Sequence, residues 1–233
     1  MHDFFSSDIE GFRVQTRTQF DGACQRCLQL SAEAAEQLAY LTFPGRSAAE
    51  CIAIAFWSKC VRACQASFLL VERGMVADAQ ATLRGAVETL FHAVALVRKP
   101  GVLERLREHD DAEKRKQVEK MFQHKDIRAA LSDEDKGRLQ VLSALPKGNP
   151  FSVLDAAAAA KMTHLYEMLY RTLSQNAAHS TLTSLNHELT SKEAGGPRLR
   201  FGPTNDQLEW TINQIAECFS AGIYVMEELR RRE

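Results

Sequence analysis

Two long apolar segments, joined by a short connection at Gly74, constrain this chain more than any other feature of its sequence. Segment 48–71 and segment 76–97 both lack the apolar-polar alternation of β-strands and have the length of helices. In the second segment apolar residues recur at steps of three and four, which is typical of a helix-packing seam. The seam consists of Leu83, Val87, Leu90, Val94 and Val97. The sequence therefore predicts two long core helices.

Capping residues predict where three of the helices begin. Ser47 and Glu50 have the spacing of a capping box ahead of the first long helix. Ser152 begins a helix that we expect to run through the alanine run Ala156–Ala160 to about Ser174. The sequence 204–207 (Thr-Asn-Asp-Gln) predicts the cap of the final helix.

These patterns predict one all-α domain over residues 1–233, a helical bundle of about six or seven helices. The expected parts are an N-terminal helix region (1–45), core helices (46–100 and 152–230), and a loop or small hairpin (191–203). Acidic and basic residues alternate in segment 102–138, which predicts a charged helical excursion that projects from the core with a solvated face.

Composition excludes several classes of protein. Of the 233 residues, 45% are apolar and 25% are charged, which is enough apolar surface to bury a core and argues against disorder. The 29 basic and 30 acidic residues nearly cancel, so DNA binding by bulk charge is excluded. The overall balance does not exclude a local basic patch, whose members would be Lys192, Arg198, Arg200, Arg230, Arg231 and Arg232.

The sequence also bears on location. Residues 1–5 lack the basic start and long apolar stretch of a signal peptide, and the longest uncharged apolar stretch, 51–57, is too short to span a bilayer. A chain of this size needs no disulfide bonds to stabilise its fold. We therefore expect a cytoplasmic protein with reduced cysteines and no membrane partner.

Four cysteines have a spacing that could hold zinc. Cys24 and Cys27, together with Cys60 and Cys64, could supply four thiolates to a tetrahedral ion. They lie in helical patterns rather than turns, however, where free cysteine packs as a small apolar residue. Core packing is the favoured interpretation, and we expect neither a metal nor another cofactor. Phosphate-binding loops and G-x-S-x-G hydrolase motifs do not occur in the sequence.

A small set of polar residues lies within the core segments. Arg84 and Glu88 are spaced i, i+4 beside the apolar seam. On the later helix Tyr170 and Ser174 share one stripe, and Arg171 and His179 share the next. Such a cluster could bind a polar ligand or perform acid–base chemistry. The alternative is a buried polar network that joins two core helices and is purely structural.

The motifs Arg84-x-x-x-Glu88, Tyr170-x-x-x-Ser174 and His179-Ser180 resemble an uncharacterised family of helical bacterial proteins. In that family an R-x-x-x-E helix is followed by Y-x-x-x-S-x-x-x-H-x-S, whereas this chain has four residues between Ser174 and His179. The resemblance covers roughly residues 50–225. It implies an all-helical fold and no established activity.

A weaker resemblance is to HEPN domains, helical proteins that include metal-independent ribonucleases of toxin and phage-defence systems. Their motif is Arg, four to six residues, then His, whereas seven residues separate Arg171 from His179 here. The resemblance implies that His179 acts on a ribose 2′-OH and that Arg171 stabilises the phosphorane charge across a homodimer interface.

Three hypotheses follow, and whether the chain is an enzyme stays open among them. The first is a HEPN-like protein that acts on RNA or a nucleotide through His179 together with Arg171 or Arg84. The second is a non-catalytic homodimeric interaction module in which the polar cluster is structural. The third is a small-ligand sensor whose site is lined by Arg84, Glu88, Tyr170 and Ser174 together with His179.

Overall fold

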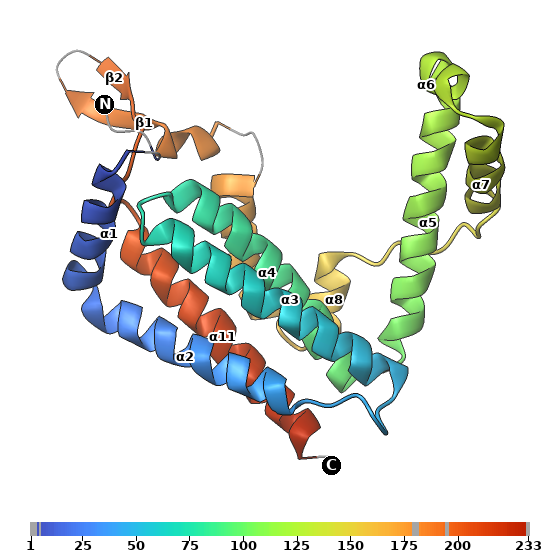
Figure 1. Cartoon of the computed structure of the whole chain (residues 1–233), viewed down its shortest axis with the longest axis horizontal. Coiled ribbons are helices and arrows are strands. Elements are labelled where there is room, and N and C mark those ends of the chain that lie inside the picture. The colour runs from blue at the N-terminus through green and yellow to red at the C-terminus, as the bar shows by residue number, and fades with distance from the viewer. Residues whose placement is uncertain (1–3, 5, 179–181, 194–195, 232–233) are drawn as a thin grey trace.

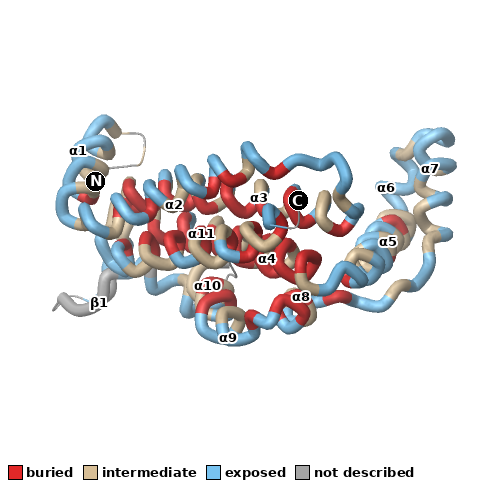
Figure 2. Tube along the Cα trace, turned by 90° about the horizontal axis from the view of Figure 1, so that it is seen from below, coloured by how far each residue is buried: buried red, intermediate tan, exposed pale blue. Residues whose placement is uncertain are grey.

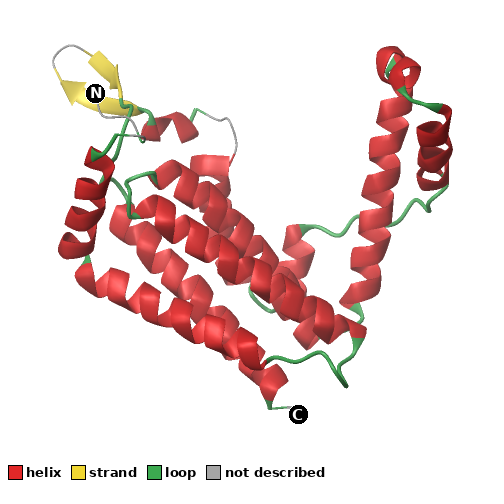
Figure 3. Cartoon of the chain, viewed as in Figure 1, coloured by secondary structure: helices red, strands yellow, loops and turns green. Residues whose placement is uncertain are grey.

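A computed structural model describes residues 4, 6–178, 182–193 and 196–231, most of them helical (Figure 3). The α-helices are α1 (Asp8–Gln19), α2 (Asp21–Tyr40), α3 (Ala48–Val71), α4 (Val76–Arg98), α5 (Val102–Gln123), α6 (Lys125–Ala130), α7 (Asp133–Ser143), α8 (Val153–Ala159), α9 (Thr163–Leu165), α10 (Arg171–Leu173) and α11 (Leu208–Arg230). The other elements are the π-helical turns η1 (Tyr166–Tyr170) and η2 (Ser174–Ala178), the 3-10 turn η3 (Ser184–His187), and the strands β1 (Leu189–Glu193) and β2 (Gly196–Leu199). The all-α class is confirmed.

Four long helices form the bundle that carries the rest of the chain. Figure 1 shows α2, α3, α4 and α11 side by side, with α11 in contact with the other three. Helix α4 is covered on most sides, because α8, α10 and η2 pack on the face that α3 and α11 leave open. The buried positions accordingly follow these helices (Figure 2).

Local signals set the two central helices as the sequence predicts. The predicted seam on α4, from Leu83 to Val97, is fully buried. The capping box is confirmed as well, because the Ser47 hydroxyl accepts from the backbone N–H of Glu50 at 3.3 Å and the Glu50 carboxylate accepts from the backbone N–H of Ser47 at 2.9 Å. Two backbone donors at the start of α3 that lack an intrahelical partner are thereby satisfied.

A close contact between two helices sets the spacing inside the bundle. Gly222 of α11 lies against the indole ring of Trp57 on α3, and a Cβ atom on Gly222 would lie 2.0 Å from Cζ3 of that ring. The indole Nε1–H donates to the Gln37 side chain of α2 at 3.1 Å, and Gln37 in turn donates to the Ile223 carbonyl at 2.9 Å. Three helices therefore meet at one buried tryptophan.

Helices α5, α6 and α7 form an arm that extends away from the bundle (Figure 1). Only Val102, Ala112 and Val118 of these three helices are buried, and most of the arm's surface is solvent-exposed (Figure 2). The returning loop is tied to α5, where the His109 Nδ1 accepts from the backbone N–H of Phe151 at 3.2 Å. The described arm extends past the predicted charged segment, to residue 143.

The expected count of six or seven helices is wrong, because three segments divide further than predicted, and the first of them is the N-terminal region, which forms α1 and α2. The arm contains three helices, and the helix expected from Ser152 to Ser174 breaks after Ala159, where Lys161 adopts a left-handed φ of 54°. The predicted cap of the final helix is also wrong. Gln207 precedes α11 with a left-handed φ of 60° and makes no side-chain capping bond.

Strands β1 and β2 pair as a short antiparallel hairpin over 189–199. The hairpin and the C-terminal end of α11 lie at opposite ends of the bundle (Figure 1), separated by a helix of about 35 Å. Arg198 and Arg200 therefore lie far from Arg230 and Arg231, and the single basic patch predicted from the sequence does not form among these four. Arg232 lies outside the described residues, as does the Lys192 side chain.

Among the described helices, α3 is long and apolar enough, by length and composition alone, to cross a membrane. The core helix of a bundle meets the same criterion, and 44% of its most apolar 18-residue window is buried within this structure. The absence of a membrane partner stays a prediction.

We predict that Gly222→Ala lowers the free energy of unfolding by about 1–3 kcal/mol, because the new methyl group must displace the buried Trp57 ring. Gly137→Ala in the exposed helix α7 is the control, since nothing lies within 4 Å of the added methyl group. That variant is expected to gain up to about 1 kcal/mol in helix propensity. Urea denaturation measures both, and equal stability of the two variants would contradict the prediction.

Candidate functional site

Two π-helical turns distinguish the segment that packs on α4. η1 ends at Tyr170 and η2 begins at Ser174, with the three residues of α10 between them. The π-helix is rare, and single π-helical turns within α-helices are frequent at functional sites. Because both turns contact α4, they place the Tyr170 and Ser174 side chains opposite Arg84.

The four predicted ligand-binding residues meet in one network, here called the Arg84 cluster (Arg84, Glu88, Tyr170 and Ser174). Arg84 donates from Nε to the Ser174 hydroxyl at 3.0 Å and from Nη2 to the Tyr170 hydroxyl at 2.5 Å. Tyr170 donates to the Glu88 carboxylate at 3.2 Å, and Arg84 Nη1 lies 3.3 Å from the same carboxylate oxygen.

The Arg84 cluster is buried at one end and open at the other. Tyr170 is only 6% exposed, whereas the side chains of Arg84 and Glu88 are 26% and 33% exposed. Burial, together with the Glu88 carboxylate, raises the pKa of Tyr170, so this hydroxyl stays protonated and donates. The Tyr166 ring stacks on Tyr170 at 5.1 Å between centroids and covers the buried end.

The guanidinium group of Arg84 keeps part of its donor capacity. A guanidinium has five N–H groups, and the three described partners account for three of them. Each terminal nitrogen therefore keeps one N–H beyond those used within the described residues. An arginine oriented in this way can bind a planar anion or a phosphate oxygen.

Of the two predicted catalytic residues, the structure describes only Arg171, which has no described contact with the Arg84 cluster. Arg171 pairs with Glu167 at 3.0 Å, and both side chains are more than half exposed. His179, which directly follows η2 in the sequence, lies outside the described residues.

His92 is a neighbour of the cluster that the sequence analysis did not assign to it. Its Nδ1 lies 2.8 Å from the carbonyl oxygen of Glu88, and its ring stacks on Phe56 with 5.2 Å between centroids. Its i+4 spacing from Glu88 is the signal that could have identified it. The Nδ1 contact fixes the ring beside the backbone that carries the Glu88 side chain.

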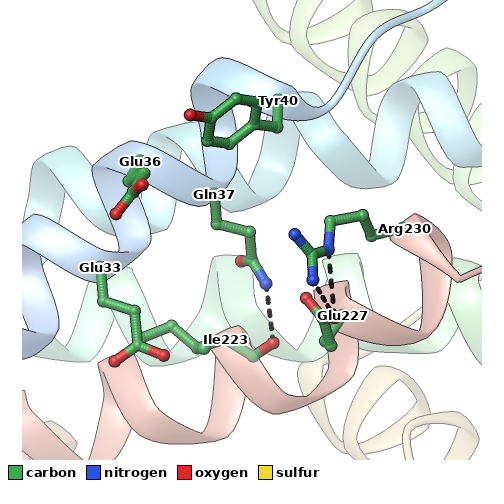
Figure 4. Close-up of a pocket in the computed structure, with 7 residues that line it drawn as sticks. All are labelled: Glu33, Glu36, Gln37, Tyr40, Ile223, Glu227 and Arg230. Carbon is green, nitrogen blue, oxygen red and sulfur yellow. Dashed lines mark hydrogen bonds and ion pairs between the residues drawn. The ribbon is translucent and has the colours of Figure 1, made fainter.

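Away from the Arg84 cluster, a cavity lies between α2 and α11 (Figure 4). It has a volume of about 230 Å³ and is lined by Glu33, Glu36, Gln37, Tyr40, Ile223, Glu227 and Arg230. Arg230 is paired with Glu227 at 2.8 Å, and the Gln37 amide donates to the backbone. With three carboxylates against one paired cation, this cavity does not suit a phosphate ligand.

The cysteines do not gather as a set of four. Cys60 and Cys64 instead meet Cys218 of α11, and the three sulfur atoms lie within 4.8 Å of one another. Burial raises the pKa of the Cys60 and Cys64 thiols, while hydrogen bonds from these two thiols lower that of Cys218. Burial also raises the pKa of Cys27, to about 12.

We predict that the free energy of unfolding falls as the pH drops below about 6.5, in part because of His92. Burial lowers the pKa of His92 below its ordinary value of 6.5. Between the lowered pKa and 6.5, His92 is therefore protonated in the unfolded chain but neutral in the folded chain. The stability from this residue is therefore present above pH 6.5 and is lost towards the lower folded pKa, with a slope of at most about 1.4 kcal/mol per pH unit.

Denaturation midpoints measured between pH 7.5 and 5.5 would test this, with His92→Gln expected to flatten the dependence. His124→Gln is the control, because His124 is exposed on the arm. An equal slope in wild type and His92→Gln would contradict the assignment.

Comparison with known proteins places the Arg84 cluster within a shared segment. A family model matches residues 50–197, which contain all four members of the cluster but neither α2 nor α11. Comparison with curated proteins and with solved structures gives no match. Because the family model covers more than half of the chain, the protein belongs to a family of unknown function, DUF5677.

Proposed function

We propose that the Arg84 cluster binds the phosphate of a nucleotide or of RNA, in a HEPN-like protein that acts on such ligands. The observation that carries the proposal is the geometry of Arg84. Its guanidinium is held by Ser174, Tyr170 and Glu88, yet it is 26% exposed and keeps two N–H groups beyond these partners.

The chemistry of the Arg84 cluster suits a ligand that carries both an anion and hydroxyl groups. The two remaining N–H groups of Arg84 can donate to phosphate oxygens. The Glu88 carboxylate, 33% exposed, can accept from a ribose hydroxyl or a base N–H. The π-helical turns support this use, because they hold Tyr170 and Ser174 against Arg84.

The proposed reaction follows the resemblance to HEPN ribonucleases. His179 would take the proton from a ribose 2′-OH, whose oxygen attacks the adjacent phosphorus while the 5′-oxygen leaves and takes a proton from water, and the imidazolium would then release its own proton to solvent. Arg171, exposed beside Glu167, would stabilise the charge on the phosphorus oxygens. The proposal includes a homodimer and a cytoplasmic location, the latter supported by six free cysteines.

We predict that Arg84→Gln weakens binding of fluorescent nucleotides or short single-stranded RNA about 10- to 100-fold, measured by fluorescence anisotropy. This is the effect of losing charge-assisted hydrogen bonds to a phosphate. The matched control is Arg138→Gln, which removes an arginine from an i, i+4 pair with Glu134 on the exposed arm. Equal binding by wild type and Arg84→Gln, or no binding by wild type, would contradict the proposed site.

Incubation of the same RNAs with wild type in EDTA tests the reaction. Cleavage that His179→Ala abolishes supports the HEPN-like activity, and cleavage that survives this substitution contradicts it. Binding at Arg84 without cleavage would favour the ligand-sensor hypothesis.

A second candidate function is a non-catalytic homodimeric interaction module. The observation that favours it is that the network bridges α4 and the η1–η2 segment through Tyr170, which is only 6% exposed. Such a cluster can serve to hold two elements in register.

This second candidate predicts that Arg84→Ala lowers the free energy of unfolding by about 1–3 kcal/mol, because the partly buried Glu88 and Tyr170 lose their partner. Thermal melting is the measurement, with Arg138→Ala as the exposed control. An Arg84→Ala variant that melts like wild type but no longer binds ligand would exclude the purely structural role.

A further inference from the structure

Three buried thiols meet at the contact of α3 and α11. The Cys60 and Cys218 sulfur atoms are 3.7 Å apart, and the Cys64 sulfur lies within 4.8 Å of both. The three residues are 0–1% exposed. This thiol cluster (Cys60, Cys64 and Cys218) is separate from the Arg84 cluster and has no part in the proposed function.

The packing of the two helices explains how the thiols come together. Cys60 and Cys64 are spaced i, i+4 and therefore share one face of α3. Cys218 lies one turn before Gly222, whose missing side chain lets α11 approach α3 at Trp57. The close approach at the glycine carries the Cys218 sulfur to the face of α3 on which the other two thiols lie.

The sulfur spacing matches that of metal-thiolate sites. Zinc–sulfur bonds of about 2.3 Å in a tetrahedral site place neighbouring sulfur atoms about 3.8 Å apart. The separation of Cys60 and Cys218, 3.7 Å, already has this value, and a small shift would bring in Cys64. Thiolate ligands select soft ions such as Cu(I) and Zn(II).

Ligand number distinguishes between these ions. Zinc in structural sites takes four protein ligands, whereas the described Cys, His, Asp and Glu residues supply three here. Cu(I) is a soft ion whose coordination is complete with two or three thiolate ligands, so three cysteines without a fourth ligand suit it better than zinc. We propose that Cys60, Cys64 and Cys218 form a three-sulfur binding site for Cu(I).

An ion can reach this site only if the protein moves, because all three cysteines are buried from solvent. The contact between α3 and α11 must open locally before the ion enters. Uptake by the folded protein is therefore expected to be slower than by exposed thiols.

The test titrates the reduced, full-length protein with Cu(I) under anaerobic conditions, against a chromophoric Cu(I) chelator. We expect one ion bound per chain, with ultraviolet thiolate-to-metal absorption and a raised Tm. Cys218→Ala is expected to reduce the affinity more than about 10-fold. Cys27→Ala, equally buried on α2, and Cys51→Ala, half-buried on α3, are the controls and are expected to bind as wild type.

Retention of all the Cu(I) by the chelator in the wild-type titration would overturn the proposal without reliance on any variant. Binding that survives Cys218→Ala, or that is lost equally in Cys27→Ala, would overturn the assignment of the ligands. Preferential uptake of Zn(II) from an equimolar mixture of the two ions would overturn the assignment of Cu(I). None of these results depends on nucleotide or RNA binding.

Discussion

The contact between Gly222 and the Trp57 indole ring sets the distance at which α11 lies against α3, and much of the bundle depends on that distance. The same indole binds Gln37, so the position of α2 follows from it. Cys218, one turn away, reaches the α3 thiols only because the helices are this close. Because Gly222 has no side chain, α11 can lie close to α3, and this contact sets the spacing of the helices in the bundle.

Helix α4 connects this core to the candidate site. The apolar seam of α4 packs inside the bundle. Arg84 and Glu88, on another face of α4, point toward the π-helical segment. Because Tyr170 is buried and donates to Glu88 while it accepts from Arg84, the two charged side chains have little freedom to reorient. A site preorganised in this way loses little conformational entropy when a ligand binds.

Much of the helical framework could be predicted because it rests on local signals. The α4 seam and the Ser47–Glu50 capping box depend on residues three or four positions apart, which periodicity reveals. The pairing of Arg84 with Tyr170 could be suggested only as a hypothesis, since 86 positions separate them. Their approach depends on how the η1–η2 segment packs on α4 and on the π-helical turns, which have no clear sequence signature.

Other features escaped prediction for related reasons. The left-handed conformations at Lys161 and Gln207 occur at residues without a strong preference for them, so tertiary packing has overridden local propensity there. Cys218 has no partner near it in sequence, and its meeting with Cys60 depends on the crossing of two helices. The basic residues of the hairpin and of the C-terminal end of α11 lie far apart in space. The sequence alone could not show this, because their separation depends on how α11 packs in the bundle.

The arm formed by α5–α7 has a consequence for how the molecule moves through a solvent. An elongated projection increases hydrodynamic drag without adding much mass, so a 26.1 kDa chain of this shape diffuses more slowly than a sphere of equal weight. It would leave a gel-filtration column ahead of compact standards. A single copy can thus resemble a dimer by elution volume, and light scattering, which reports mass independently of shape, separates the two.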